Sequence, residues 1–229
     1  MEVNAIILAA GRGTRVGGRE PKVLLSVAGR PLILHTLERF RRAREVKKAV
    51  LVVPPEAVGD YEAMLAPAPE ASLEITVHRG GGRRQDSVRA GLAALDPDCD
   101  AVVVHDGARP FAAPELIDRC AREACAGRSV TVAVPARNTI KRVLRGQVRE
   151  TLQRQSLWEV QTPQAFPLRL LRDAYAKAER DGVEATDDAM LVERLGVPVG
   201  VVEGSTTNLK VTYPEDLLYA EALVSNGVV

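Results

Sequence analysis

The sequence predicts an α/β fold in which a mostly parallel, twisted sheet is covered by helices on both faces. Its 229 residues suit one domain, 1–229, large enough to bury a core without disulfides or metals. Hydrophobic residues make up 46% and charged residues 27%, which is typical of a folded chain. Short apolar runs also alternate with segments of helical periodicity, and that alternation predicts crossover connections between parallel strands. We therefore expect ligands to bind beyond the carboxyl ends of the strands.

Strands are expected where continuous apolar runs are bounded by turn residues, because strands buried on both faces have this composition. The first run, from Val3 to Ala9, stops just before a Gly-Arg-Gly sequence. The expected strands are 3–9, 49–53, 73–77, 101–104, 130–134 and 197–203.

Helices are expected where apolar residues recur at helical spacing between these strands. In the first of them, Leu34, Leu37 and Phe40 would face the core. Ser87 suits the N-cap of a later helix, and Thr186-Asp187-Asp188 suits another N-cap with acids in the first turn. The expected helices are 31–42, 56–65, 87–95, 114–125, 167–180 and 187–195, with a last helix that begins at Pro214.

One polar segment interrupts this alternation and predicts a protruding β-hairpin arm over 136–154. Residues 138–152 mix both charges, and Gly146 forms a turn between two short β-like runs. A lone hairpin is marginally stable in water. We therefore expect the arm to pack against something, such as a second copy of the chain in a homodimer.

Charge and composition favour a small-molecule partner over nucleic acid or a membrane. The formal net charge is +1 and aromatic residues are only 3%, so neither a basic surface nor base-stacking platforms are expected. The three cysteines form no C-x-x-C pair, and an odd number suits a reducing compartment. With no apolar or basic leader in the first residues, a cytoplasmic location is expected.

The sharpest local pattern follows the first strand, where Gly11 and Gly13 are accompanied by Arg15 and then Lys22. Glycines let backbone N–H groups approach an anion closely, and the two basic residues add charge, so the pattern favours phosphate binding. It is not a Walker loop, because no G-x-x-x-x-G-K-[ST] pattern occurs. It is not a dinucleotide-binding fingerprint either, because Val16 occupies the position of that motif's third glycine. The glycine pair alone is equally compatible with an ordinary turn.

A second glycine loop, Gly80 to Val88, joins an expected strand to an expected helix and contains arginines, including Arg84. One interpretation is a capped helix with solvated arginines. The other is the wall of a nucleotide pocket, where small residues admit a flat base and Ser87 or backbone amides bind its edge.

Asp106 lies where an expected strand ends, so its carboxylate is expected to face the site. A carboxylate beside phosphates usually binds Mg²⁺, which prefers oxygen ligands, although Asp106 could instead only pair with Arg109. His105 is interpreted as a packed or hydrogen-bonded structural residue. Late in the chain, Lys210 lies in the segment 204–212, where polar residues precede a short apolar stretch. Its side chain is a candidate to bind an anion.

Taken together, these segments resemble one family, the 2-C-methyl-D-erythritol 4-phosphate cytidylyltransferases of the non-mevalonate isoprenoid pathway. The resemblance spans essentially the whole chain and rests on six separated motifs in order. These are LAAGRGTR with the following PK, the GG-x-x-R-x-x-SV loop at 80–88, HDGARP at 105–110, TPQ at 162–164, TDD at 186–188 and N-x-KVT at 208–212. The resemblance implies a Rossmann-like nucleotidyltransferase fold, a homodimer joined through the 136–154 arm, and transfer of CMP from CTP to methylerythritol phosphate with release of pyrophosphate.

The resemblance also implies roles for individual residues. Arg15 and Lys22 would stabilise the transition state on the triphosphate, with Mg²⁺ or another divalent cation held by the phosphates and by Asp106. The implied CTP pocket consists of Ala9, Ala10, Gly11, Gly13, Gly81, Gly82, Arg84, Ser87 and Asp106. Arg154 and Lys210 would position the acceptor, with Asp106, Arg109, Thr139, Thr162 and Thr186, and Thr139 and Arg154 would come from the partner's arm.

Two positions depart from the family pattern. Val23 follows Lys22 where glutamine is usual, and Gly82 stands where many members carry an acidic or polar residue. The role of Lys22 is unaffected, while Gly82 would contribute only through its backbone.

Two alternatives remain at this point. A D-ribitol-5-phosphate cytidylyltransferase would share the nucleotide loops, and the charges of Arg154 and Lys210 do not separate the two acceptors. A non-catalytic nucleotide-binding regulator is the other alternative, although Arg15, Lys22 and Asp106 argue against it because a pure binder has no leaving pyrophosphate to stabilise.

Overall fold

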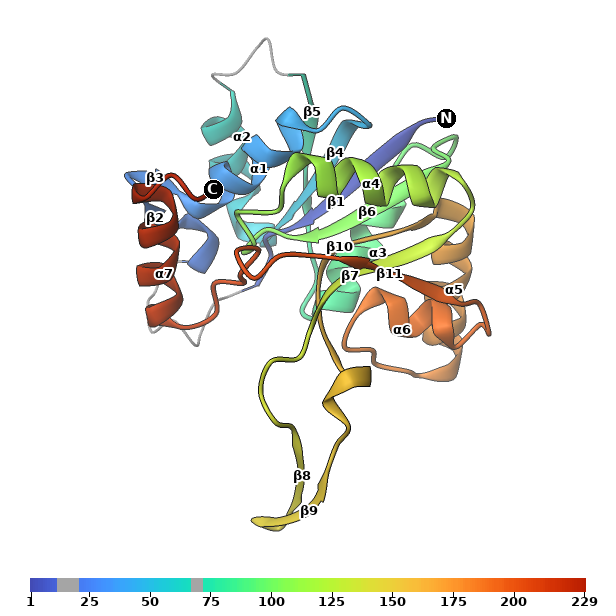
Figure 1. Cartoon of the computed structure of the whole chain (residues 1–229). Helices are drawn as coiled ribbons and strands as arrows, with labels where there is room; N and C mark the ends of the chain where they lie inside the picture. Colours follow the sequence, from blue (N-terminus) through green and yellow to red (C-terminus); the bar gives the residue numbers. More distant parts are fainter. Residues whose placement is uncertain (12–20, 67–71) are drawn as a thin grey trace.

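The computed structural model describes residues 1–11, 21–66 and 72–229, and its centre is a seven-stranded mixed sheet (Figure 1). The strand order is β11-β7-β10-β6-β1-β4-β5. The bounds of these strands are β1 Val3–Leu8, β4 Val46–Val53, β5 Glu74–Arg79, β6 Ala101–Asp106, β7 Ser129–Pro135, β10 Trp158–Pro167 and β11 Val199–Glu203. Among these strands β10 alone runs antiparallel to its neighbours β6 and β7, so the predicted mostly parallel sheet is confirmed.

Helices cover both faces of the sheet, as predicted. On one face pack α1 (Leu32–Arg42), α2 (Val58–Leu65), α4 (Pro114–Cys125) and α7 (Pro214–Ser225). On the other pack α3 (Arg84–Ala94), α5 (Leu168–Asp181) and α6 (Asp188–Glu193). Strand β1 shows why two cores form, because Ala5 and Ile7 join the first core while Ile6 joins the second, following the two-residue period of a strand.

Shorter elements complete the described chain. A small two-stranded sheet pairs β2 (Ser26–Val27) with β3 (Arg30–Pro31) ahead of α1. Single turns of 3₁₀ helix are η2 (Lys22–Leu24), η3 (Pro55–Ala57) and η4 (Arg154–Ser156). No helix among the described residues has the length and hydrophobicity that a membrane crossing requires.

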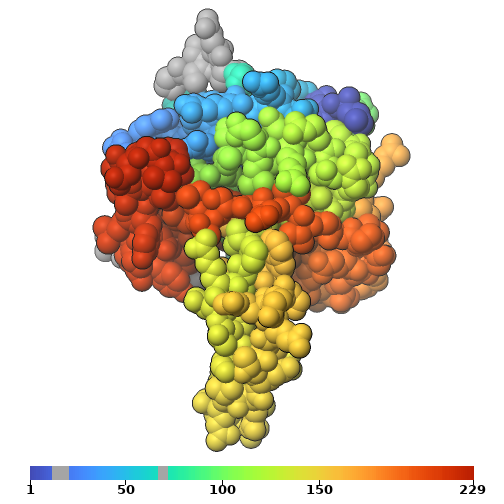
Figure 2. Space-filling view, viewed as in Figure 1, coloured from blue at the N-terminus to red at the C-terminus, as the bar shows by residue number. Residues whose placement is uncertain are grey.

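The predicted arm is present as a hairpin of β8 (Lys141–Leu144) and β9 (Gln147–Thr151). It projects from the body of the molecule in both overall views (Figures 1 and 2). Every residue of both strands is exposed, including the apolar side chains of Val143, Leu144 and Val148. The hairpin therefore has no core of its own within this chain.

The structure differs from the sequence prediction most at strand β10 and at the start of helix α3, and the short strands β2 and β3 were not predicted either. Strand β10 was not predicted, because it carries Pro163 and buries the polar side chains of Gln161, Thr162 and Gln164, and proline and polar residues rarely mark a central strand. Pairing between β10 and β7 is irregular between Val160 and Gln164, and this irregularity accommodates the proline. Helix α3 begins at Arg84 rather than at residue 87, so the expectation that Ser87 forms its N-cap is wrong.

Candidate active site

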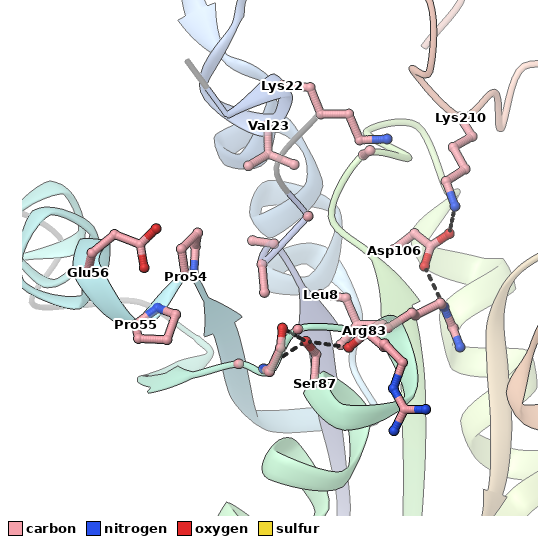
Figure 3. A pocket seen from close by; sticks show the side chains of 18 residues that line it. Leu8, Lys22, Val23, Pro54, Pro55, Glu56, Arg83, Ser87, Asp106 and Lys210 are labelled. Atoms are coloured by element: carbon pink, nitrogen blue, oxygen red, sulfur yellow. Dashed lines mark hydrogen bonds and ion pairs between the residues drawn. The ribbon is translucent and has the colours of Figure 1, made fainter. Parts of the chain in front are cut away.

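A cavity of about 740 Å³ opens beyond the carboxyl ends of β1, β4 and β6 (Figure 3). This is the edge of the sheet where ligands of such folds bind. Lys22, Asp106 and Lys210 lie together on one side of it, opposite Pro54, Pro55 and Glu56. The predicted site residues that line this cavity are Ala9, Ala10, Gly11, Lys22, Gly81, Gly82, Arg84, Ser87, Asp106 and Lys210.

Asp106 lies at the end of β6 and is the centre of charge in the cavity. Its Oδ2 accepts a 2.6 Å hydrogen bond from Lys210 Nζ, and its Oδ1 lies 3.4 Å from Arg84 Nε. Burial by itself raises the pKa of the Asp106 carboxyl, but Lys210 and Arg84 outweigh burial and hold that pKa well below its usual range. Asp106 is therefore ionised, and its partners are these two cations rather than Arg109.

Arg84 connects the cavity to a second carboxylate deeper in the fold. Its terminal nitrogen donates a 2.8 Å hydrogen bond to Asp188 Oδ2, and the Asp188 side chain is completely buried. Burial lowers the pKa of the Arg84 guanidinium, but Asp188 and then Asp106 outweigh burial and raise it. Arg84 is thus a fixed cation on the cavity wall rather than the solvated arginine of the simpler interpretation.

Close packing explains the glycines of the second loop. A Cβ at Gly80 would lie 2.6 Å from Ala10 Cβ, and a Cβ at Gly81 would lie 2.4 Å from Asp86 Cβ. Ser87 Oγ accepts a hydrogen bond from the Gly81 amide, which fastens the loop to α3. Gly82 has open space where its side chain would be, which is consistent with a contribution from its backbone alone.

His105 and Thr162 fix the backbone of Asp106. The Asp106 amide donates to Thr162 Oγ1 at 3.0 Å, Thr162 Oγ1 lies 3.1 Å from His105 Nδ1, and His105 Nε2 lies 3.0 Å from the carbonyl of Arg109. Because a carbonyl only accepts, Nε2 carries the proton and Nδ1 accepts from the threonine. Burial lowers the pKa of His105 to about 4. The histidine is therefore neutral and structural, as predicted.

Arg109 and Lys22 attach neighbouring segments to the site. Arg109 donates to the carbonyl of Asn208 at 2.8 Å, and the Asn208 amide in turn donates to Gln161 Oε1 and to the carbonyl of Thr162. Lys22 Nζ donates to the carbonyl of Val211 at 3.0 Å. The loop that carries Lys210 is thereby held between two basic residues of the predicted site.

Of the remaining predicted residues, Thr139, Arg154 and Thr186 do not line the cavity. Gly13 and Arg15 lie outside the described residues. Thr186 is exposed ahead of α6, whose N-cap is Asp187, with its carboxylate accepting from the Met190 amide. Thr139 and Arg154 are exposed on the arm, where Arg154 donates to the carbonyl of Arg137.

Several residues that line the cavity were given no role from the sequence. Leu8, Val23, Gly80, Arg83 and Ala108 lie in or directly beside the quoted motifs, whereas Pro54, Pro55 and Glu56 lie outside all of them. One signal was available, since Pro54 and Pro55 directly follow β4 and so stand at the carboxyl end of the strand beside β1. Asp188 was interpreted as part of a helix start and counted in the TDD motif, without a role at the site. Its contact with Arg84 joins residues 104 positions apart.

The cavity offers Mg²⁺ few protein ligands. Across residues 1–11, 21–66 and 72–229, no three His, Cys, Asp or Glu side chains gather to hold a metal ion. Mg²⁺ commonly binds through one or two carboxylates together with substrate phosphates. Asp106 therefore fits the ion as a single protein ligand that acts together with a triphosphate.

Comparisons with known proteins agree with this geometry. A family model described as "IspD: 2-C-methyl-D-erythritol 4-phosphate cytidylyltransferase" matches residues 3–226. Proteins of that name from Bacillus velezensis and Pelotomaculum thermopropionicum are 44% and 43% identical to this chain. The first alignment covers 98% of this chain and 96% of the relative, and the second covers 97% and 94%.

Solved structures show the same fold. The 4-diphosphocytidyl-2C-methyl-D-erythritol synthase from Anaerococcus prevotii has a TM-score of 0.86 at 31% identity, covering 98% of this chain and 96% of that one. The 2-C-methyl-D-erythritol 4-phosphate cytidylyltransferase from Thermus thermophilus has a TM-score of 0.80 at 37% identity, covering 98% and 100%. With its fold, its cavity and its full-length match in agreement, this chain is a cytidylyltransferase that belongs to the 2-C-methyl-D-erythritol 4-phosphate cytidylyltransferase family.

Proposed function

We propose that this enzyme transfers CMP from CTP to 2-C-methyl-D-erythritol 4-phosphate, giving 4-diphosphocytidyl-2-C-methyl-D-erythritol and pyrophosphate in isoprenoid precursor synthesis. The observation that carries the proposal is the cavity at the sheet edge, which gathers Lys22, Arg84, Asp106 and Lys210 in a chain of this family. The same comparisons favour this acceptor over ribitol 5-phosphate, and an enzyme over a non-catalytic regulator.

The reaction is an in-line displacement at the α-phosphorus of CTP. An oxygen of the acceptor's phosphate forms the new bond, while the bond from the α-phosphorus to the bridging oxygen of the pyrophosphate breaks. That attacking oxygen is already anionic at neutral pH, so no general base is required. The neutral, hydrogen-bonded His105 agrees with this, because both of its nitrogens are already occupied.

The chain's own residues supply positioning and charge. Lys22, with Arg15, neutralises the charge that builds on the triphosphate as pyrophosphate leaves. Lys210, with Arg154, holds the phosphate of the acceptor. Asp106, together with the phosphates of CTP, would hold Mg²⁺, which would supply further neutralisation of the charge on the leaving pyrophosphate.

The arm supports a homodimer in which each site borrows residues from the partner. It exposes Val143, Leu144 and Val148, and it carries Thr139 and Arg154, which this chain does not bring to its own cavity.

We also infer a cytoplasmic location for the enzyme, because all three cysteines are free and a reducing compartment suits free cysteines.

The test is pyrophosphate release by the purified chain with CTP and Mg²⁺, measured with methylerythritol phosphate, with ribitol 5-phosphate and with no acceptor. We expect turnover with the first acceptor alone, and its loss when the metal is chelated. Turnover with ribitol 5-phosphate instead would reassign the acceptor. CTP binding without turnover on either acceptor would favour the regulator.

A further inference from the structure

Two buried side chains outside the cavity, Tyr175 and Asp188, are linked by hydrogen bonds to Arg84, which lines it. Asp188 Oδ1 accepts a 2.5 Å hydrogen bond from the hydroxyl of Tyr175 on α5, and Asp188 Oδ2 accepts the 2.8 Å bond from Arg84. The backbone amide of Asp188 is itself held, because it donates to Gln164 Oε1 at 3.0 Å. Neither Tyr175 nor Asp188 lines the cavity, so neither has a direct contact to offer to a substrate there.

Arg84 needs such an anchor because its second contact is shared. Its bond to Asp106 is long, at 3.4 Å, and Asp106 also accepts the shorter bond from Lys210. When a nucleotide or its cation engages Asp106, the contact to Asp188 is what keeps the Arg84 guanidinium at the cavity wall. Without that contact a long, rotamer-rich side chain would have to be ordered by the ligand itself, at the expense of affinity.

The Tyr175 hydroxyl stays protonated and donates to Asp188. Burial, followed by the charge of Asp188, raises the pKa of the Tyr175 hydroxyl, so it remains a donor. With one hydrogen bond from Tyr175 and one from Arg84, both oxygens of the buried carboxylate have a partner, as a buried charge requires.

We propose that Tyr175 and Asp188 are positioning residues for nucleotide binding, which act by holding Arg84 at the CTP cavity. The inference rests on the proposed function only in that CTP is the nucleotide bound. It predicts that Asp188→Asn weakens CTP binding about tenfold, since a hydrogen bond to a charged group contributes on that order. Tyr175→Phe, which leaves Asp188 and Arg84 in place, is expected to weaken it about threefold.

The experiment measures the Kd for CTP and Mg²⁺ by calorimetry, without acceptor, so it reads binding independently of turnover. The key arm is a double-mutant cycle with Arg84→Met. If Asp188 acts through Arg84, Asp188→Asn has no further effect on the Kd once Arg84 is replaced, so the two effects are not additive.

The matched control is Asp118→Asn, a buried carboxylate on α4 that accepts the Arg44 and Glu45 amides on the opposite face of the sheet. It reports what loss of a buried structural carboxylate does to CTP binding, and we expect no change in the Kd. Folding of each variant is checked by circular dichroism, and Tyr175→Phe provides the readout if Asp188→Asn fails to fold.

Additive effects of Asp188→Asn and Arg84→Met, or an unchanged Kd in folded Tyr175→Phe and Asp188→Asn, would overturn the inference. Absence of turnover in the wild-type enzyme, with the Kd pattern as expected, would contradict the proposed function and leave this inference standing. The two failures are therefore distinguishable.

Discussion

The cavity and the arm differ in how far their ion pairs are buried and connected to one another. At the cavity, Lys210, Asp106, Arg84 and Asp188 form one connected and largely buried chain of ion pairs. On the arm, Arg142 and Glu150 form an isolated pair, 3.1 Å apart, with both side chains more than half exposed. The cavity is thus organised before any ligand arrives, whereas the arm presents apolar side chains that none of the described residues covers.

The residues implied for the two substrates are divided between these two regions. The described residues implied for CTP line a cavity that one chain builds for itself, while Gly13 and Arg15 lie outside the described residues. Two residues implied for the acceptor, Thr139 and Arg154, stand on the arm. On the proposed function, we therefore expect CTP binding to require one chain only and acceptor binding to require the homodimer.

The largest effect is expected at the cavity, from Lys22→Ala. Loss of a cation that neutralises developing charge should lower kcat by about 10²- to 10³-fold, while the Kd for CTP changes much less. Steady-state pyrophosphate release and calorimetry measure the two quantities. Lys47→Ala, an exposed position near the opposite end of β4, serves as the control, and a near-normal kcat in Lys22→Ala would remove this role.

The next largest effect is expected at the arm, from the double variant Val143→Asp and Val148→Asp. These two residues pair across the hairpin, and burying carboxylates in an apolar interface is costly. We expect a monomer by analytical ultracentrifugation, turnover lower by about 100-fold, and an unchanged Kd for CTP. A monomeric variant with full turnover would show that turnover does not depend on the dimer.

A third prediction concerns stability at acid pH, through His105 behind the cavity. Its pKa falls from 6.5 to about 4 on folding, so the unfolded chain takes up the proton first as the pH falls. Stability is therefore full above about pH 6.5 and decreases by about 3 kcal/mol as the pH approaches 4. Urea unfolding at a series of pH values measures this loss.

The matching substitution is His105→Gln, which should flatten that part of the pH profile whatever its effect at neutral pH. His78→Gln, on the exposed side of β5, is the control and should keep the slope. An unchanged slope in His105→Gln would assign the acid lability to other groups.

The smallest effect is expected from Glu150→Gln on the arm. The pair that it breaks is exposed, and exposed ion pairs contribute little. Turnover should change by less than about twofold, and the sedimentation coefficient should stay the same. A large loss would mean that this pair is buried by a partner, which would make the arm resemble the cavity more closely than one chain suggests.

Much of the fold could be predicted from the sequence because its strands are buried on both faces. Strand β6 (Ala101–Asp106) has no exposed residue, and such a strand has a continuous apolar run as its signal. Helix α4 was predicted with its observed bounds, Pro114–Cys125, because proline marks its first turn. Strand β10 escaped prediction since its buried residues are polar and find partners only in the folded chain.

The site was predictable where residues adjacent in sequence act together, and not where contact requires the fold. Gly81 lies in the loop before α3 and Ser87 lies in the first turn of that helix, so the two could be grouped from the sequence. Arg84 and Asp188 are 104 positions apart and meet only because α3 and α6 pack on the same face of the sheet. No local pattern reports such a contact, so Asp188 could be interpreted only as a helix start.

Strand β10 has a mechanical consequence for the arm. It begins at Trp158, just after the arm, and runs between β7 and β6, where Thr162 holds the Asp106 amide. A pull on the arm would therefore act through the chain of β10 on Thr162, and through its hydroxyl on the backbone of Asp106 at the centre of the cavity. A variant with a shortened arm must therefore keep Trp158–Pro167 intact. Otherwise the deletion would disturb the cavity as well as the arm.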